Sequence, residues 1–133
     1  MQFNGYEVNN FKFELTQYDD DTKEFKIMPE FTKSVRDCGD DKYKVQLIFS
    51  LNATDENPLP FNMEVAMTGG FTIVMDSEND ELKETLLHEN TVAIMFPFLR
   101  TLIATLTTAA NIQPLILPII SLANTFKANE EIK

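Results

Sequence analysis

The first half of the chain alternates apolar and polar residues with the two-residue period of half-buried β-strands. The segments that show this period lie at about 11–16, 25–28, 43–52 and 61–73. Polar clusters such as Asp19-Asp20-Asp21 and Asp55-Glu56-Asn57-Pro58 separate them, as turns do. Pro29 places the second segment at an edge or a bend, and Gly69-Gly70 permits a bulge in the fourth. We therefore expect a four-stranded antiparallel meander that is apolar on one face and wet on the other.

The second half changes to helical spacing from about Asp80, where Ser77-Glu78-Asn79 supplies capping and first-turn residues. Pro97 should kink or restart this helix. One face follows the i, i+3, i+4, i+7 template and consists of Met95, Phe98, Leu99, Leu102, Ile103, Leu106 and Ala110. The opposite face carries the small residues Thr101, Ala104, Thr105 and Thr108. Because the helix has almost no charge, we expect the first face to cover its own sheet and the second to form an interface with another subunit.

No charged residue occurs from Thr101 to Phe126, a length that would allow a membrane span. Two prolines, Pro114 and Pro118, argue against a span, as do the polar residues Asn111, Gln113, Ser121, Asn124 and five threonines, so we expect no membrane insertion. Instead, we expect an extended, proline-containing connection at 111–120 and a short C-terminal helix at about 120–131. The whole chain, 1–133, then forms one α+β domain in which the sheet is followed by the long kinked helix and these last elements.

The chain has a formal net charge of −10 and a sequence pI near 4.4. Binding to nucleic acid or to anionic lipid requires clustered Lys and Arg, so both partners are disfavoured. The single cysteine, Cys38, cannot form an intrachain disulfide, and the N-terminus shows neither a basic nor an apolar leader region. These features favour a reducing, cytoplasmic compartment.

The sequence shows no convincing catalytic or metal-binding pattern. His88 has no Asp, Cys or second His at a ligand-like spacing, which is typical of a solvated helix residue. Cys38 has no histidine beside it, which is typical of an inert thiol. The acidic clusters lack the spacing of a calcium loop, and Gly69-Gly70 lacks the context of a nucleotide site. We therefore expect a protein that is not an enzyme and uses no cofactor or metal.

Apolar residues in irregular segments could line an exposed groove, because bent strands and connections rarely carry so many of them. These residues are Phe25, Ile27, Met28, Phe31, Leu115, Ile116, Leu117 and Ile119. Methionine suits a surface that must adapt to many ligands. The alternative is a closed α+β module that binds one small apolar ligand between sheet and helix. The residues alone leave both interpretations open.

Three segments of the second half resemble the SecB family of protein-export chaperones. They are Gly69-Gly70-Phe71-Thr72-Ile73, Phe96-Pro97-Phe98-Leu99-Arg100 and Gln113-Pro114-Leu115-Ile116-Leu117-Pro118. The resemblance implies an α+β subunit in a homotetramer, a dimer of dimers that uses the long helices. It also implies an ATP-independent holdase that keeps unfolded precursor polypeptides export-competent in hydrophobic grooves and delivers them to the motor SecA. In the family the groove is lined by the second strand, the connection between helices and the helices themselves, which include the irregular segments described above.

The family docks on SecA through acidic residues on the solvent face of the sheet, and Glu14 and Glu64 match those positions. Strand alternation independently places both carboxylates on the polar face. The chain departs from the family pattern at Asn10, which replaces a carboxylate, and at Asn62, which replaces an apolar residue. Some SecB-like proteins instead serve a dedicated antitoxin of a toxin–antitoxin system. That role is the alternative to general export.

Overall fold

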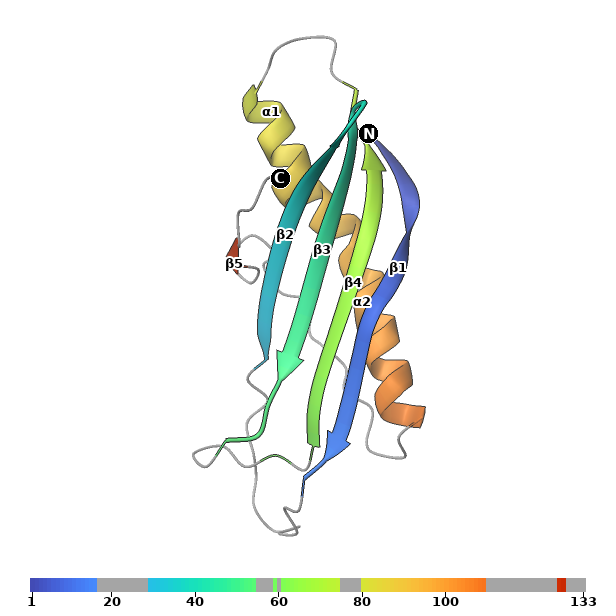
Figure 1. Ribbon diagram of the computed structural model, residues 1–133, viewed down its shortest axis with the longest axis vertical. Coiled ribbons are helices and arrows are strands. Elements are labelled where there is room, and N and C mark those ends of the chain that lie inside the picture. Colours follow the sequence, from blue (N-terminus) through green and yellow to red (C-terminus); the bar gives the residue numbers. More distant parts are fainter. Residues whose placement is uncertain (17–28, 55–58, 60, 75–79, 110–126, 129–133) are drawn as a thin grey trace.

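The computed structural model describes residues 1–16, 29–54, 59, 61–74, 80–109 and 127–128. Within them, a five-stranded sheet forms one layer, and a long helix crosses one of its faces (Figure 1). The strands are β1 (Gln2–Leu15), β2 (Glu30–Gly39), β3 (Lys42–Leu51), β4 (Phe61–Thr72) and the two-residue β5 (Lys127–Ala128). The helix consists of α1 (Asp80–Thr85), a π-helical segment η1 (Leu86–Asn90) and α2 (Thr91–Ala109).

The strands lie in the order β1-β4-β3-β2-β5, and all neighbours are antiparallel except β2 and β5. The predicted α+β class, a four-stranded antiparallel sheet followed by a long helix, is confirmed. The predicted meander is wrong, because β1 pairs with β4 and lies at the edge opposite to β2. This is the order of a Greek key traced from β4 back to β1. Alternation determines which side chains share a face, but it does not identify the neighbouring strand.

β1 begins much earlier than the strand predicted at 11–16, because two bulges hide its alternation. Its pairing with β4 shifts register opposite Gly70 and again at Asn9. At the first shift Gly5 has a φ of 101°, which glycine adopts without the steric cost borne by other residues. The expectation of a bulge in β4 at Gly69-Gly70 is therefore wrong. The extra residue lies in β1, and β3 pairs with β4 without interruption.

β2 begins at Glu30, and the strand predicted at 25–28 lies outside the described residues. A tight turn joins β2 to β3. Its two central residues, Asp40 and Asp41, have φ values of 54° and 61°. Positive φ at both central positions is the backbone of a type I′ hairpin, whose twist matches that of the flanking strands. The turn thereby fixes the pairing of β2 with β3 along their length.

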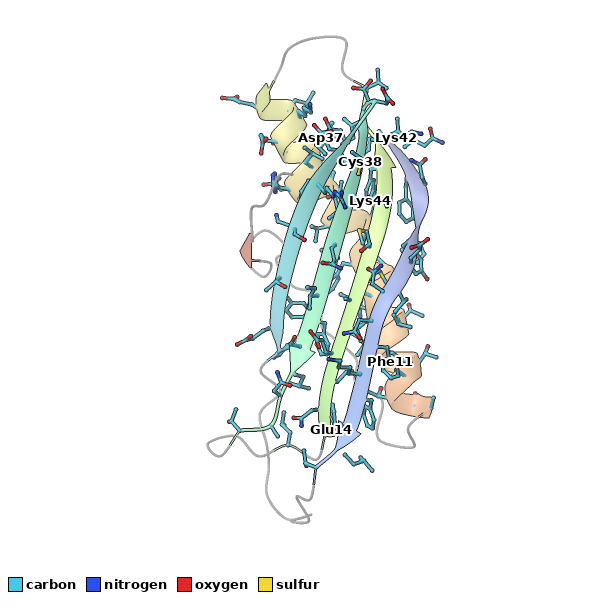
Figure 2. All side chains as sticks on the ribbon, viewed as in Figure 1. Phe11, Glu14, Asp37, Cys38, Lys42 and Lys44 are labelled. Atoms are coloured by element: carbon cyan, nitrogen blue, oxygen red, sulfur yellow. The ribbon has the colours of Figure 1, made fainter. Side chains whose placement is uncertain are left out.

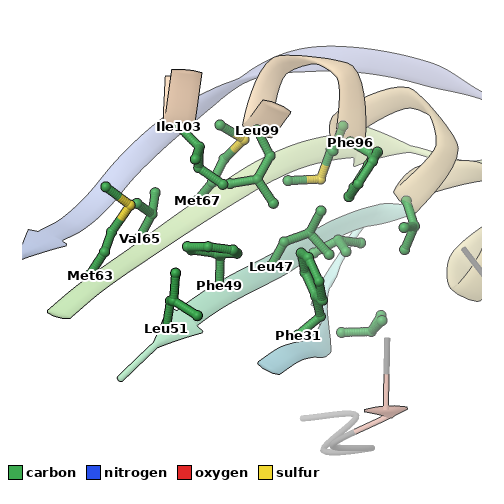
Figure 3. Packing of buried hydrophobic residues seen from close by; sticks show 14 of the residues in the cluster. Phe31, Leu47, Phe49, Leu51, Met63, Val65, Met67, Phe96, Leu99 and Ile103 are labelled. Carbon is green, nitrogen blue, oxygen red and sulfur yellow. The ribbon is translucent and has the colours of Figure 1, made fainter. Parts of the chain in front are cut away.

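The hydrophobic core lies between the sheet and α2 (Figure 3). Alternate residues of β3 and β4 form its floor, and Leu47, Phe49 and Met67 are fully buried there. Gly69 allows the helix to approach closely, since a Cβ at this position would lie 2.7 Å from the Sδ of Met95. The close approach of α2 therefore depends on the absence of a side chain at this point of β4.

The packed face of α2 is rotated relative to the predicted one. Phe96 is buried in the core, whereas Phe98, which was expected on the packed face, is 40% exposed. The two phenylalanines flank the same buried row, which includes Met95 and Leu99. Helical periodicity identifies this row, but it cannot decide which of its two sides the sheet will cover.

The helix begins at Asp80, as predicted, but Pro97 does not restart it. The α-helical conformation continues through Pro97. The carbonyl that loses its amide partner belongs to Ala93, an exposed residue, so solvent can replace that hydrogen bond. The irregular turn occurs earlier, in η1, where the Nζ of Lys33 donates a hydrogen bond to the His88 carbonyl at 2.8 Å.

The C-terminal helix expected at about 120–131 is wrong where it can be compared, because Lys127–Ala128 forms β5. This segment pairs in parallel with Thr32 and Lys33 of β2. An edge strand carries unpaired backbone groups, and β5 supplies partners for them. The rest of that helix, and the connection expected at 111–120, lie outside the described residues.

By length and composition alone, the helical stretch Glu81–Ala109 could cross a membrane, since it has 29 residues and contains an 18-residue window with a mean hydropathy of 1.6. The core helix of a soluble protein meets the same criterion. In this fold, one side of the stretch packs on the sheet and contributes to the core.

Candidate functional site

Large apolar side chains are exposed along β1 and the adjoining side of α2. The exposed fraction is 43% for Tyr6, 43% for Val8, 45% for Phe11, 66% for Leu15 and 40% for Phe98. We call these five residues the β1 strip. Figure 2 shows Phe11 at the outer side of the sheet, where α2 passes behind β1.

The strand register shows that the β1 strip lies on the helix-covered face of the sheet. Val8 pairs with Met67 and Phe11 with Val65, and both of these β4 partners are fully buried. Paired residues on neighbouring strands point to the same face. β1 is the edge strand, however, and α2 packs mainly on β3 and β4, so these β1 side chains keep about half of their surface exposed. The strip is therefore a continuation of the core that no described residue fully covers.

An aromatic cluster fixes the helix end of the β1 strip. The Phe98 ring centroid lies 5.1 Å from that of Tyr6 and 5.9 Å from that of Phe3. Phe3 in turn lies 5.2 Å from Phe71 of the core. Such ring pairs contribute about 0.5–1.5 kcal/mol each beyond burial. Because these rings are already held in place, they lose little conformational entropy when a ligand binds here.

The outward face of the helix changes character at the start of α2. Upstream, Glu81, Glu84 and Glu89 are exposed and charged. In α2, Arg100 is the one charged residue, and apart from Phe98 the exposed positions carry alanine, proline or threonine. Among the residues predicted for an oligomer interface, Thr101, Thr105 and Thr108 are exposed and Ala104 is half-buried. The structure therefore places the predicted interface residues along an uncharged surface of α2.

Two of these threonines already satisfy their hydroxyl groups within the helix. The Thr101 hydroxyl donates to the Pro97 carbonyl at 3.0 Å, and the Thr108 hydroxyl donates to the Ala104 carbonyl at 2.8 Å. A hydroxyl bonded in this way loses little when water is removed from around it. The face can consequently be covered by another protein surface at a low desolvation cost.

The structure describes one of the predicted groove residues, Phe31. Phe31 is 6% exposed and packs against Phe49 and Phe96, with ring centroids 5.5 and 6.1 Å away. In this chain Phe31 is thus a core residue and presents almost no surface to a ligand. The other predicted groove residues lie outside the described residues: Phe25, Ile27, Met28, Leu115, Ile116, Leu117 and Ile119.

The β1 strip was missed in the sequence. Alternation correctly placed Phe11 and Leu15 on the apolar face, but it could not show that β1 lies at an edge beyond the helix. Tyr6 and Val8 precede the predicted strand because the bulges disrupt the period there. The one available signal was the number of apolar residues in 1–15, which exceeds what an exposed tail would carry.

Glu14 and Glu64 lie on the open face of the sheet, as predicted, and line a hollow of about 610 Å³. Figure 2 shows Glu14 near the end of β1. Its Oε1 accepts a hydrogen bond from Asn62 Nδ2 at 3.0 Å, and Lys12 is paired with Glu64 in the register. At this end of the sheet the Glu14 carboxylate is therefore hydrogen-bonded to an amide, and an ammonium group lies opposite Glu64.

The polar residues of η1 form a structural cluster. His88 Nε2 lies 3.1 Å from the carboxylate of Glu84, one helical turn earlier. The carbonyl of the same histidine accepts the hydrogen bond from Lys33, a buried residue. Within the described ranges, no three His, Cys, Asp or Glu side chains gather closely enough to hold a metal ion. The arrangement ties α1 and η1 to β2.

Comparison with known families identifies the fold. The family model described as preprotein translocase subunit SecB matches residues 8–132. The chain belongs to the SecB family. A protein-export protein SecB of Ehrlichia ruminantium is 33% identical over 84 residues, which cover 59% of this chain and 48% of that protein. An uncharacterised protein of Methanocaldococcus jannaschii is 28% identical over 138 residues, covering the whole chain and 86% of that protein.

A solved structure has the same fold. The SecB-like chaperone Rv1957 of Mycobacterium tuberculosis superimposes with a TM-score of 0.71 over 90% of both chains, at 16% sequence identity. That chaperone was solved in complex with a ChAD peptide from the antitoxin HigA1. The resemblance seen in the sequence motifs is thus confirmed, and the chain is a member of a chaperone family associated with protein export.

Proposed function

We propose that this SecB-family protein is an ATP-independent holdase that binds unfolded or precursor polypeptides on exposed apolar surface and keeps them export-competent. The observation that carries the proposal is the β1 strip. Four of its large apolar residues follow one face of β1, and Phe98 packs beside Tyr6, on a chain with a net charge of −10 that favours solubility. A surface that only needed to be soluble would not carry them together.

The affinity of the β1 strip can be bounded from burial. Fully covering one large apolar side chain contributes about 1.5–3 kcal/mol, and the strip residues are already about half-buried. A short client segment therefore binds weakly. A long unfolded chain that touches several subunits gains avidity from multivalency. Because each contact is weak, a client segment can dissociate when it folds or when another protein binds it. The chaperone would therefore hold the client without folding it.

The subunits assemble, in this proposal, as a homotetramer, a dimer of dimers, in the cytoplasm. Support comes from the uncharged outward face of α2, where Thr101, Ala104, Thr105 and Thr108 lie. SecA, which would receive the client, is expected to dock at Glu14 and Glu64. The groove residues predicted at 25–31 and 115–119 would extend the apolar surface beyond the β1 strip. The whole chain, 1–133, is proposed as one chaperone domain, and no enzymatic activity or cofactor is required for this role.

A chaperone dedicated to an antitoxin is the second candidate. It is favoured by the structural similarity to Rv1957, which binds a peptide of an antitoxin. The two roles share the same apolar surface and differ in client range. A third interpretation, a closed module for one small ligand, is less favoured because large side chains such as Phe49, Met67 and Leu99 fill the space between sheet and α2.

The test measures aggregation of urea-denatured luciferase after dilution into buffer with stoichiometric protein. Light scattering should show suppression by the wild type and by Val74→Ser, which alters an exposed apolar residue (64%) outside the strip. The double variant Phe11→Ser/Leu15→Ser should lose most of the suppression at unchanged molecular mass. Full activity of the double variant would contradict the proposal. A lower molecular mass of the double variant would also contradict the proposal, since the β1 strip would then be part of an interface between subunits.

Client range separates the two candidates. Peptide arrays that cover many unrelated precursor sequences should bind in proportion to their apolar content if the protein serves export. Binding confined to a single antitoxin-derived segment would instead identify the dedicated role. Replacing Leu117 and Ile119 by Ser should weaken client capture more than it reduces oligomer stability, which size-exclusion chromatography with light scattering can monitor.

A further inference from the structure

The open face of the sheet carries two cations directly opposite each other. Arg36 of β2 and Lys44 of β3 are register partners, and both are exposed. Like charges in this arrangement destabilise a sheet. Among the described residues, neither side chain forms an ion pair, although the chain has 21 carboxylates and 11 cationic residues. Sheet stability therefore does not explain why both residues are basic.

A hollow of about 360 Å³ lies beside these two cations. Polar side chains from the four long strands line it, and three of them are Asn9, Gln46 and Thr68. The bulge in β1 places Asn9 at this position. Gln46 Nε2 donates to Asn9 Oδ1 at 3.4 Å, and the Thr68 hydroxyl donates to the same oxygen. Because the Asn9 oxygen is already engaged, its Nδ2 group remains as a donor toward a bound molecule.

The hollow continues across the sheet. A second hollow, of about 270 Å³, shares Lys44 and Thr68 with the first and extends over Gly70 to Asn4 and Glu7 of β1. Gly70 has no side chain to occupy this path, and the nearest atom to a Cβ built there would be the Cβ of Asn4, at 3.7 Å. The four strands from β2 to β1 span about 14 Å at the usual strand spacing, the length of about four extended residues. We call the two hollows together the outer trough.

We propose that the outer trough binds a short acidic segment of a polypeptide, with its carboxylates on Arg36 and Lys44. The guanidinium group can hold a carboxylate through two parallel hydrogen bonds, and the ammonium group adds a point charge. Ser34 and the Asn9 amide supply further donors. Glu7, at the far end, directs the acidic residues of the ligand toward β2 and β3.

This site is separate from the β1 strip. Arg36 follows the buried Val35 and Lys44 precedes the buried Val45 in their strands, so they point to the face of the sheet opposite the helix. It extends the proposed function without depending on it. On a strongly acidic protein, an acidic segment would be repelled from most of the surface. The outer trough gives such a segment one place to bind.

The experiment titrates the ¹⁵N-labelled full chain with the peptide Gly-Ser-Glu-Glu-Ser-Gly and with its Gln-Gln analogue at 50 mM salt. We expect the Glu-Glu peptide alone to shift the backbone amides of Arg36, Lys44 and Asn9. Arg36→Gln and Lys44→Gln should each weaken binding about two- to fivefold, and 500 mM salt should abolish it. Lys12→Gln is the matched control, since Lys12 is another cation of the same face, placed beside Glu64, and should leave binding unchanged.

Three results of the titrations, and one from a further variant, would overturn the proposal. Equal shifts with both peptides would show that the carboxylates are not recognised, and shifts confined to other amides would place binding elsewhere. Inorganic phosphate, titrated in parallel, provides the third: if phosphate shifts the same amides while the Glu-Glu peptide does not, the trough is a phosphate site. Gly70→Thr, which fills the trough and keeps both cations, should weaken binding of the Glu-Glu peptide, and unchanged binding would also count against the trough.

Discussion

Gly69 and Gly70 are neighbours in β4 that face opposite sides of the sheet, and they provide a matched pair of substitutions. A Cβ at Gly69 would lie 2.7 Å from the Met95 sulfur and 3.2 Å from the Phe71 ring. A Cβ at Gly70 would have its nearest neighbour at 3.7 Å, which is an ordinary contact distance. Gly69→Ala therefore tests the close packing of α2 on the sheet, and Gly70→Ala is its control.

The expected magnitudes follow from two opposing effects. Replacing glycine by alanine at a compatible position stabilises a protein by about 0.4–1 kcal/mol, because the unfolded chain loses freedom. Overpacking a filled core costs about 1–3 kcal/mol. Gly70→Ala should therefore raise the free energy of unfolding by about 0.5 kcal/mol. Gly69→Ala should lower it by about 1 kcal/mol, because Met95 is flexible and can yield part of the way.

Urea denaturation followed by circular dichroism measures both variants at one fixed protein concentration, since oligomerisation would otherwise shift the transition. A double-mutant cycle adds specificity. Met95→Val removes the sulfur that the new methyl group would meet, so Gly69→Ala should cost at least 0.5 kcal/mol less in that background. Equal effects of the two alanine substitutions, or strict additivity in the cycle, would refute the close approach of α2 at Gly69.

Three further substitutions probe the elements that hold the site. Lys33→Met should lower the free energy of unfolding by about 1–3 kcal/mol in urea titrations, because the His88 carbonyl loses its donor. Hydrogen bonding to Tyr43 raises the pKa of Lys83 above 10.5. The stabilisation of the fold by this contact is therefore present below pH 10.5 and is lost as the pH rises through the raised pKa. Tyr43→Phe should lower the pKa of Lys83 in an NMR titration. Asn62→Ala should cost about 1 kcal/mol in thermal denaturation, since its amide bridges two strand ends.

The sequence predicted the fold class because its signals are local. Alternation in 43–52 and 61–73 identifies β3 and β4, and helical spacing after Asp80 identifies the long helix. The strand order was not predictable in the same way. β1 pairs with β4 across almost the whole described sheet, and nothing in the period of either segment encodes that pairing.

The site was predicted less completely than the fold. Phe31 was expected in an exposed groove because its segment was interpreted as irregular, but its ring packs against Phe49 in the core. Phe98 was expected in the core and lies at the surface, in the β1 strip. Both errors arise from tertiary placement: α2 packs mainly on β3 and β4, and this packing determines which apolar residues are covered. The polar face was predicted correctly at Glu14 and Glu64, where alternation alone decides orientation.

Site-specific photo-crosslinking tests the central claim most directly. A benzophenone amino acid replaces Phe11 in the β1 strip, or Ser50 on the open face of the sheet as the control. The client is reduced, carboxymethylated α-lactalbumin, which stays unfolded. The account predicts strong crosslinks from position 11 to the client and few from position 50. Crosslinks from position 11 that join only copies of this chain, or equal yields from both positions, would contradict it.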